Sequence, residues 1–205
     1  MGHNTSLRNL QLNSNSIGAY WDASTKIDTP EGPLFLANAL SVNRGLTALS
    51  MDWNWLGKAG AGAVVLLLSR NNTLRSLSLA GNLVGATGAE QIAGALRSNT
   101  TLTSLNLDSN ALCDTGDINE GFYNDSGVLA IAAVLEESAG LYAPADLLTI
   151  YTGDIMSSQS LSGDLQCERR CGCALTALSV RLNSINAQTA ASLRRACGSR
   201  VQLLI

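Results

Sequence analysis

The chain of 205 residues is poor in the residue types on which most catalytic sites depend. It contains one histidine, His3, close to the N-terminus. Ser-His-Asp and Cys-His arrangements need a histidine held by the folded scaffold, so nucleophilic catalysis of this kind is disfavoured. The phosphate-binding pattern G-x-x-x-x-G-K-[ST] is also absent. The sequence therefore predicts a protein that is not an enzyme and needs no cofactor.

Charge and long apolar runs are equally scarce. Charged residues make up 14% of the chain, the net charge is −3, and no block of lysine and arginine occurs. Nucleic acids are bound through clusters of basic residues, so we expect no nucleic-acid partner. The most apolar run, residues 59–68, is too short to cross a bilayer, and the N-terminus lacks the pattern of a secretory signal. These features favour a cytoplasmic protein without an integral membrane segment.

Five cysteines are an odd number in a chain without a secretory signal, which favours reduced thiols over disulfides. Cys167, Cys171 and Cys173 lie close together in CERRCGC. The C-x-x-C spacing of structural zinc sites is absent, and a fourth ligand would have to be Cys113 or Cys197. We therefore expect no metal site, and we interpret Cys197, at a helix core position, as a small apolar residue.

A unit of about 28 residues recurs along the chain. Leu46, Leu74 and Leu102 each open the pattern L-x-x-L-x-L-x-x-N-x-L, and the unit continues with glycine and two apolar positions spaced by four. In the fifth unit the pattern has decayed, and Gly153 stands in place of the asparagine. The pattern predicts one domain, residues 1–205, with about six units that start near residues 7, 46, 74, 102, 145 and 175. Inserts are expected near residues 19–31, 117–126 and 156–173, all between the strand and the helix of a unit.

The spacing of the apolar residues indicates a strand followed by a helix in each unit. Alternate leucines in L-x-L lie on one side of a strand, and Gly88, Ile92 and Leu96 lie on one face of a helix. A single unit cannot bury these residues, whereas stacked units can. We therefore predict a curved α/β solenoid, with parallel strands on the concave face and helices on the convex face.

This pattern resembles leucine-rich repeats, and the 28-residue unit with a helical second half is similar to the ribonuclease-inhibitor-like subclass. The resemblance implies that the repeated asparagine bonds backbone groups of its turn and that stacked copies form a ladder. The ladder residues would be Asn15, Asn54, Asn82, Asn110 and Asn183. Gly153 would break this ladder and leave its repeat loose.

The resemblance says less about function, because one fold hosts many partners. We expect a non-catalytic module that binds a protein through the concave sheet and the loops between strand and helix. Two alternatives stay open. One is a GTPase activator resembling the Ran GTPase-activating family, and the other is the sensor segment of a NOD-like receptor.

The concave face is expected to carry small polar residues in its middle and larger groups away from the centre. Trp53 and Tyr151 are candidate anchors, because aromatic residues dominate interface cores. Trp55 is expected instead to pack under a neighbouring loop. The candidate partner-binding residues are Asp52, Trp53, Asn106, Asp108, Tyr151 and Arg181.

The inserts add aromatic and acidic residues to the same side of each unit, which favours a basic protein partner. The aromatic residues are Trp21, Phe122 and Tyr123, and the acidic ones are Asp22, Asp28, Asp117, Glu120 and Asp125.

Both ends of the chain look unfinished for a solenoid. Leu7 opens a repeat almost at once, and residues 201–205 look like the start of another unit. Terminal repeats usually carry a polar cap, and none is evident here, so we expect end-to-end self-association or a longer array. The N-terminus also matches the short pattern for lipidation at Gly2, which occurs often by chance.

Overall fold

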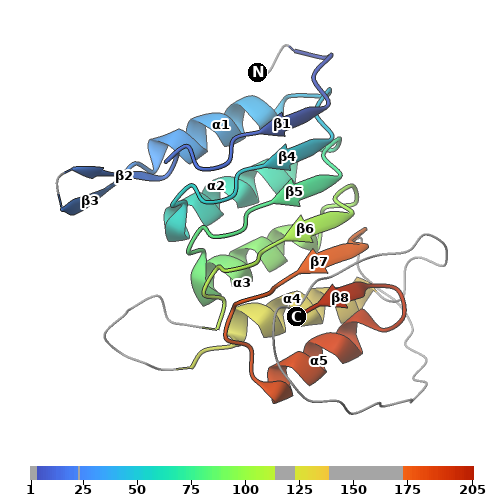
Figure 1. Ribbon diagram of the computed structural model, residues 1–205. Helices are drawn as coiled ribbons and strands as arrows, with labels where there is room; N and C mark the ends of the chain where they lie inside the picture. Colours follow the sequence, from blue (N-terminus) through green and yellow to red (C-terminus); the bar gives the residue numbers. More distant parts are fainter. Residues whose placement is uncertain (1–3, 23, 114–122, 139–172) are drawn as a thin grey trace.

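The computed structural model describes residues 4–22, 24–113, 123–138 and 173–205. Six short parallel strands form one sheet in the order β1-β4-β5-β6-β7-β8 (Figure 1). They are β1 (Asn9–Gln11), β4 (Ala48–Ser50), β5 (Ser76–Ser78), β6 (Ser104–Asn106), β7 (Ala177–Ser179) and β8 (Gln202–Leu204). The segment 201–205, which looks like the start of a further unit, thus supplies the sixth strand of the sheet.

Helices cover one face of this sheet, and each packs against the next along the solenoid (Figure 1). They are α1 (Glu31–Ser41), α2 (Gly57–Arg70), α3 (Gly85–Leu96), α4 (Ser126–Ser138) and α5 (Ala187–Cys197). The first insert forms an antiparallel hairpin of β2 (Ala19–Asp22) and β3 (Thr25–Asp28), which projects from the side where strands lead into helices. The predicted fold class, an α/β solenoid of parallel strands and helices, is confirmed.

The alternating leucines form the core between the two layers. Leu77, Leu79, Leu105 and Leu107 are each at most 1% exposed, and Ile92 of α3 covers them with no exposed surface. A fully buried leucine contributes about 1.5–3 kcal/mol relative to an exposed one. Because the leucines of one strand align with those of the next, this stabilisation arises only when repeats stack.

The glycine that recurs near the start of α1, α2, α3 and α4 allows neighbouring helices to approach closely. A Cβ on Gly127 of α4 would lie 2.5 Å from the carbonyl oxygen of Ala86 and 2.7 Å from Cβ of Ala89 in α3. A Cβ on Gly88 would similarly lie 2.9 Å from Cβ of Ala61. A side chain at these positions would push the helices apart, so the repeat keeps glycine there.

The decayed repeat expected near residue 145 lies outside the described residues, as does Tyr151. In the described sheet, β6 pairs directly with β7, with Leu105 beside Leu178. The third insert, expected near residues 156–173, lies outside the described residues except for Cys173.

Candidate interaction surface

The turn that follows each strand is fixed by a buried asparagine. Oδ1 of Asn82 accepts hydrogen bonds from the N–H groups of Asn54 at 2.9 Å and Leu56 at 3.4 Å in the preceding repeat. Its Nδ2 donates to the carbonyl oxygens of Met51 at 2.9 Å and Leu79 at 2.8 Å. Asn82 has no exposed surface, and it satisfies backbone groups that water cannot reach. One side chain therefore joins two turns.

The same bonds link five asparagines into a row. They are Asn15, Asn54, Asn82, Asn110 and Asn183. The expected break in this row does not occur, because the N–H of Asn110 donates directly to Oδ1 of Asn183 at 2.7 Å. The physical reason is the direct pairing of β6 with β7, which brings the two asparagines onto adjacent turns.

The residues on either side of each ladder asparagine adopt left-handed backbone conformations. In the second repeat these residues are Trp53, with φ of 58°, and Trp55, with φ of 56°. Trp53 is 57% exposed and Trp55 is 37% exposed. Leu83, which occupies the position of Trp55 on the next turn, is 49% exposed. We call Trp53, Trp55 and Leu83 the tryptophan rim. Trp55 is thus less covered than the sequence suggests, and Leu83 was not expected at all.

The tryptophan rim is held in place by close backbone packing. A Cβ on Gly81 would lie 2.3 Å from Cε3 of Trp53, so the indole ring rests directly on the glycine of the next turn. Trp55 and Leu83 occupy equivalent positions on adjacent turns, which follow strands about 4.8 Å apart. On the other side, the N–H of Gly18, at the base of the hairpin, donates to the carbonyl oxygen of Asn54 at 2.9 Å. The rim is therefore a preformed apolar surface beside the hairpin.

Two of the predicted partner-binding residues link repeats at the concave edge of the sheet. Oδ1 of Asp52 accepts hydrogen bonds from Oγ of Ser78 at 2.6 Å and from the N–H of Ala80 at 2.8 Å. Asp108 occupies the same position two repeats later, and its Oδ1 accepts from the N–H of Arg181 at 2.6 Å. Each carboxylate thus holds the following strand.

Asn106 and Arg181 lie at the same edge. Nδ2 of Asn106 donates to Oγ of Ser78 at 3.1 Å, and its Oδ1 accepts from the N–H of Asp108 at 2.9 Å. Ala80 occupies the position of Asp52 and Asp108 in the third repeat, but its side chain has no acceptor. Oδ1 of Asn106 therefore accepts from the N–H of Asp108 in its place. Nε of Arg181 lies 3.9 Å from Oδ2 of Asp108. The structure therefore brings Asp52, Trp53, Asn106, Asp108 and Arg181 to the strand-to-helix edge, while Tyr151 lies outside the described residues.

A second row of asparagines lies on the opposite side of the solenoid. Oδ1 of Asn71 accepts from the N–H of Leu74 at 2.8 Å, and its Nδ2 donates to the carbonyl oxygen of Leu40 at 2.8 Å. Asn99 repeats this arrangement, and the two residues are only 4% and 6% exposed. Their 28-residue spacing was the signal that could have revealed them. Both stand in Asn-x-Thr sequons, but their buried amides leave no room for a glycan.

The end of the second insert docks onto the start of α5. The hydroxyl of Tyr123 lies 2.9 Å from Oγ1 of Thr189, which occupies the repeat's glycine position and also bonds Asp125. Asn186 donates its N–H to the same hydroxyl at 3.1 Å and caps the helix by accepting from the N–H of Thr189. Tyr123 is 44% exposed, but its polar end is fixed by these bonds.

Comparison with known proteins agrees with this geometry. A family model described as Leucine Rich repeat matches residues 42–65, 70–93 and 98–116, three segments that start 28 residues apart. The fold is a leucine-rich-repeat solenoid. No curated protein matches the chain significantly in sequence.

Two solved structures are similar to this fold. The tropomodulin C-terminal domain of Caenorhabditis elegans has a TM-score of 0.59 at 10% identity, over 94% of this chain and 83% of that one. The structure described as Leiomodin-1 Actin-Binding Site 2 has a TM-score of 0.59 at 17% identity, over 94% of this chain and 80% of that one. At such low identities the likeness shows the fold alone.

The thiols of the leucine-rich repeats are not placed for chemistry. Burial raises the pKa of the Cys197 thiol to about 12, against the weaker opposing effect of Arg200. Burial also raises the pKa of the Cys113 thiol, so both stay protonated at neutral pH and are poor nucleophiles. Among the described residues, no group of three or more histidine, cysteine, aspartate or glutamate side chains could hold a metal ion. Cys167 and Cys171 lie outside those residues.

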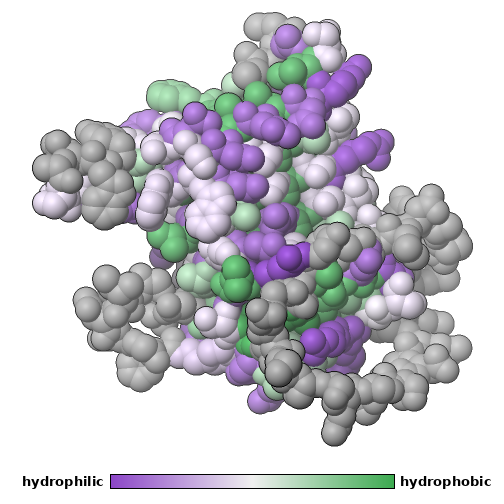
Figure 2. Space-filling model, in the orientation of Figure 1, coloured by the Kyte–Doolittle hydropathy of each residue, from purple (hydrophilic) through white to green (hydrophobic). Residues whose placement is uncertain are grey.

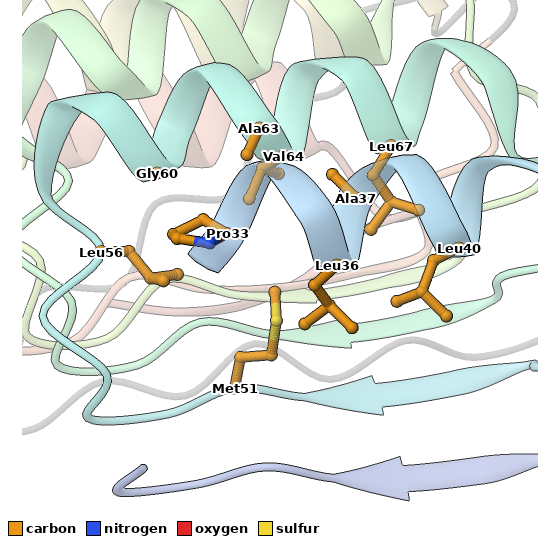
Figure 3. Close-up of a pocket in the computed structure, with 10 residues that line it drawn as sticks. All are labelled: Pro33, Leu36, Ala37, Leu40, Met51, Leu56, Gly60, Ala63, Val64 and Leu67. Atoms are coloured by element: carbon orange, nitrogen blue, oxygen red, sulfur yellow. The ribbon is translucent and has the colours of Figure 1, made fainter. Parts of the chain in front are cut away.

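A small, partly open apolar cavity also lies between α1, α2 and the end of β4 (Figure 3). Its volume is about 10 Å³, and Leu36, Leu40, Met51 and Leu67 are among the side chains that line it. This is close to the volume of one water probe, and the lining offers no polar partners, so the cavity cannot bind a small molecule. Within the described part of the chain, no helix has the length and apolarity that a membrane span requires.

Proposed function

We propose that this chain is a non-catalytic protein-binding module whose binding surface centres on the tryptophan rim. The observation that carries the proposal is the exposure of Trp53 and Trp55, 57% and 37%, on turns that the asparagine ladder holds rigid. Tryptophan is enriched among the residues that dominate binding energy, and a preformed site loses little conformational entropy on binding. Large exposed aromatics on a rigid scaffold are therefore well suited to anchor a partner.

The concave edge next to the rim would supply the polar part of the interface. Oδ1 of Asp52 and Oδ1 of Asp108 each hold the next strand. Oδ2 of Asp52 accepts from Oγ of Ser50 at 3.2 Å, and Oδ2 of Asp108 lies 3.9 Å from Nε of Arg181, so each carboxylate keeps only part of its lone pairs for a partner. Asn106 and Arg181 complete this edge. Two fixed carboxylates beside an apolar rim favour a partner with basic side chains, and such attraction weakens as salt is added.

The similar structures support binding of a protein rather than of a small molecule. The leiomodin domain is described as an actin-binding site, so actin is one candidate partner to test. We also propose that the repeats belong to the ribonuclease-inhibitor-like subclass and that the protein is cytoplasmic. The GTPase-activating and NOD-like sensor roles draw no support from a particular residue of this chain, and we do not adopt them.

The proposal is tested by a variant that removes both indoles. Trp53→Ala with Trp55→Ala should weaken partner binding about tenfold or more, because truncation of an anchor residue typically costs over 1 kcal/mol. The partner is first captured from an extract and identified by mass spectrometry, and its affinity is then measured with purified proteins. Co-sedimentation with actin filaments tests the one named candidate.

A matched control removes an exposed apolar side chain elsewhere. Leu129 on α4 is 39% exposed, and Leu129→Ala should leave binding unchanged. Circular dichroism should show that all variants keep their helices. Partner binding by the double tryptophan variant that equals wild type would refute the assignment of the rim. Tyr151→Ala separately tests the second anchor expected from the sequence.

A further inference from the structure

The first repeat leaves its core half-covered at the N-terminal end of the solenoid. Leu10 and Leu12 of this repeat are only partly buried, and so are Leu7 and Ile17. Their equivalents in the next repeat, which are Leu49, Met51, Leu46 and Leu56, are between 2% and 5% exposed. The same sequence positions are thus less covered in the first described repeat than in the second.

Apolar side chains of helix α1 are likewise more exposed than their equivalents in α2. Leu36 is partly exposed, whereas its equivalent Val64 in α2 is 2% exposed. Phe35 is 71% exposed, and its equivalent Ala63 lines the cavity between α2 and α1. By the repeat symmetry, Phe35 therefore points to the side of α1 that faces away from α2. We call Leu7, Leu10, Leu12, Ile17, Phe35 and Leu36 the terminal face, which lies at the upper end of Figure 1, where Figure 2 shows hydrophobic surface.

At the other end of the described solenoid, the last helix presents polar side chains to solvent. Gln188, Arg194 and Arg195 of α5 are all exposed. The exposed side chains of α1 include Leu34 and Phe35 instead. In the described part of the sheet, β1 has a neighbour, β4, on one side only, so its other edge presents unpaired backbone groups. Natural edge strands are commonly protected by charge, proline or a bulge, and Asn9–Gln11 has none of these.

We propose that the terminal face is covered by the terminal face of a second copy of this chain, related by a two-fold axis. A two-fold contact places the same surface patch on both partners, so a face with a net charge would repel its own copy. The terminal face contains no charged residue, and Arg8 and Glu31 lie only at its margins. The concave edge with Asp52 and Asp108 lacks this neutrality. The two β1 strands would meet edge to edge and the two α1 helices would pack through Phe35.

This proposal is tested by the molar mass of the 205-residue chain in solution. Sedimentation velocity over a range of concentrations should show a monomer of 21.4 kDa in equilibrium with a species of twice that mass. Phe35→Glu should raise the dissociation constant about a hundredfold or more, because a two-fold contact contains each substitution twice. Phe35→Ala, which adds no charge, should weaken the dimer in the same direction.

The matched control lies on the same helix. Leu34 is 45% exposed and stands at the repeat position where α3 carries the exposed Glu90, so Leu34→Glu should leave the dimer unchanged. A chain that is monomeric at all concentrations would overturn the proposal. So would larger assemblies, or a dimer that withstands Phe35→Glu or responds equally to Leu34→Glu. The tryptophan rim lies on a different surface, so its own test is independent of this outcome.

Discussion

Replacing Asn82 by alanine should destabilise the solenoid strongly, although the side chain is small and touches no ligand. Asn82→Ala leaves the N–H groups of Asn54 and Leu56 without this acceptor and the carbonyl oxygen of Met51 without its side-chain donor. All of these groups lie around a side chain with no exposed surface. A buried polar group without a partner costs about 1–3 kcal/mol, so we expect a loss of about 3–6 kcal/mol in the free energy of unfolding. That is a large part of the roughly 5–15 kcal/mol that holds a domain together.

The control is the first residue of the same ladder. Asn15 is exposed, and its Nδ2 donates only to the carbonyl oxygen of Asn13, at 3.0 Å. Asn15→Ala should therefore cost less than about 1 kcal/mol, since water replaces the lost partner. Urea unfolding followed by circular dichroism measures both variants. If Asn82→Ala and Asn15→Ala lower stability equally, the ladder does not act through buried hydrogen bonds and the reasoning fails.

Further predictions concern the helix layer and the thiols. Gly127→Ala should lower the free energy of unfolding by about 1–3 kcal/mol, because its Cβ would overlap Ala86. Gly62→Ala, in a helix with open space around it, should raise stability by about 0.5–1 kcal/mol in the same urea assay. Iodoacetamide at pH 8 should leave Cys113 and Cys197 unmodified until denaturant is added, as read by peptide mass spectrometry. Because burial raises the pKa of Cys197 from 9.0 to about 12, its contribution to stability should be present below pH 9 and lost as pH rises towards 12, and Cys197→Ala should remove this loss.

The fold could be predicted because its determinants are periodic in sequence. The alternation in L-x-L, the asparagine after it and the glycine that precedes two apolar helix positions all recur at 28 residues. Each marks a place where one repeat must fit the next: Leu77 beside Leu105, Asn82 beside Asn110, and Gly88 against Ala61. The contacts between stacked repeats therefore require the same residue types at the same positions of each unit, and this makes the sequence periodic.

The features that were not predicted are those at which the chain departs from the regular repeat pattern. Residues near 145 retain a leucine pattern, yet β7 takes the place beside β6 that this pattern predicts for them. The complete unit with Asn183 satisfies the buried ladder groups of the fourth repeat, since Oδ1 of Asn183 accepts from the N–H groups of Asn110 and Leu112. The exposure of Trp55 escaped for a different reason. Large aromatic residues are mostly buried, yet Trp55 is 37% exposed on a turn with left-handed backbone on both sides of Asn54.

That backbone conformation connects the stability of the repeat with its binding surface. Nine non-glycine residues in the described chain have positive φ, and all of them flank a ladder asparagine. Such conformations are unfavourable for residues with a side chain, so they persist because the buried asparagine fixes the turn on both sides. Since these flanking side chains point away from the core, the fold accepts serine at one turn and tryptophan at the next. The ladder thus keeps a row of positions rigid while leaving their chemistry free to vary, and Trp53 and Trp55 are where this chain has placed large aromatic side chains in that row.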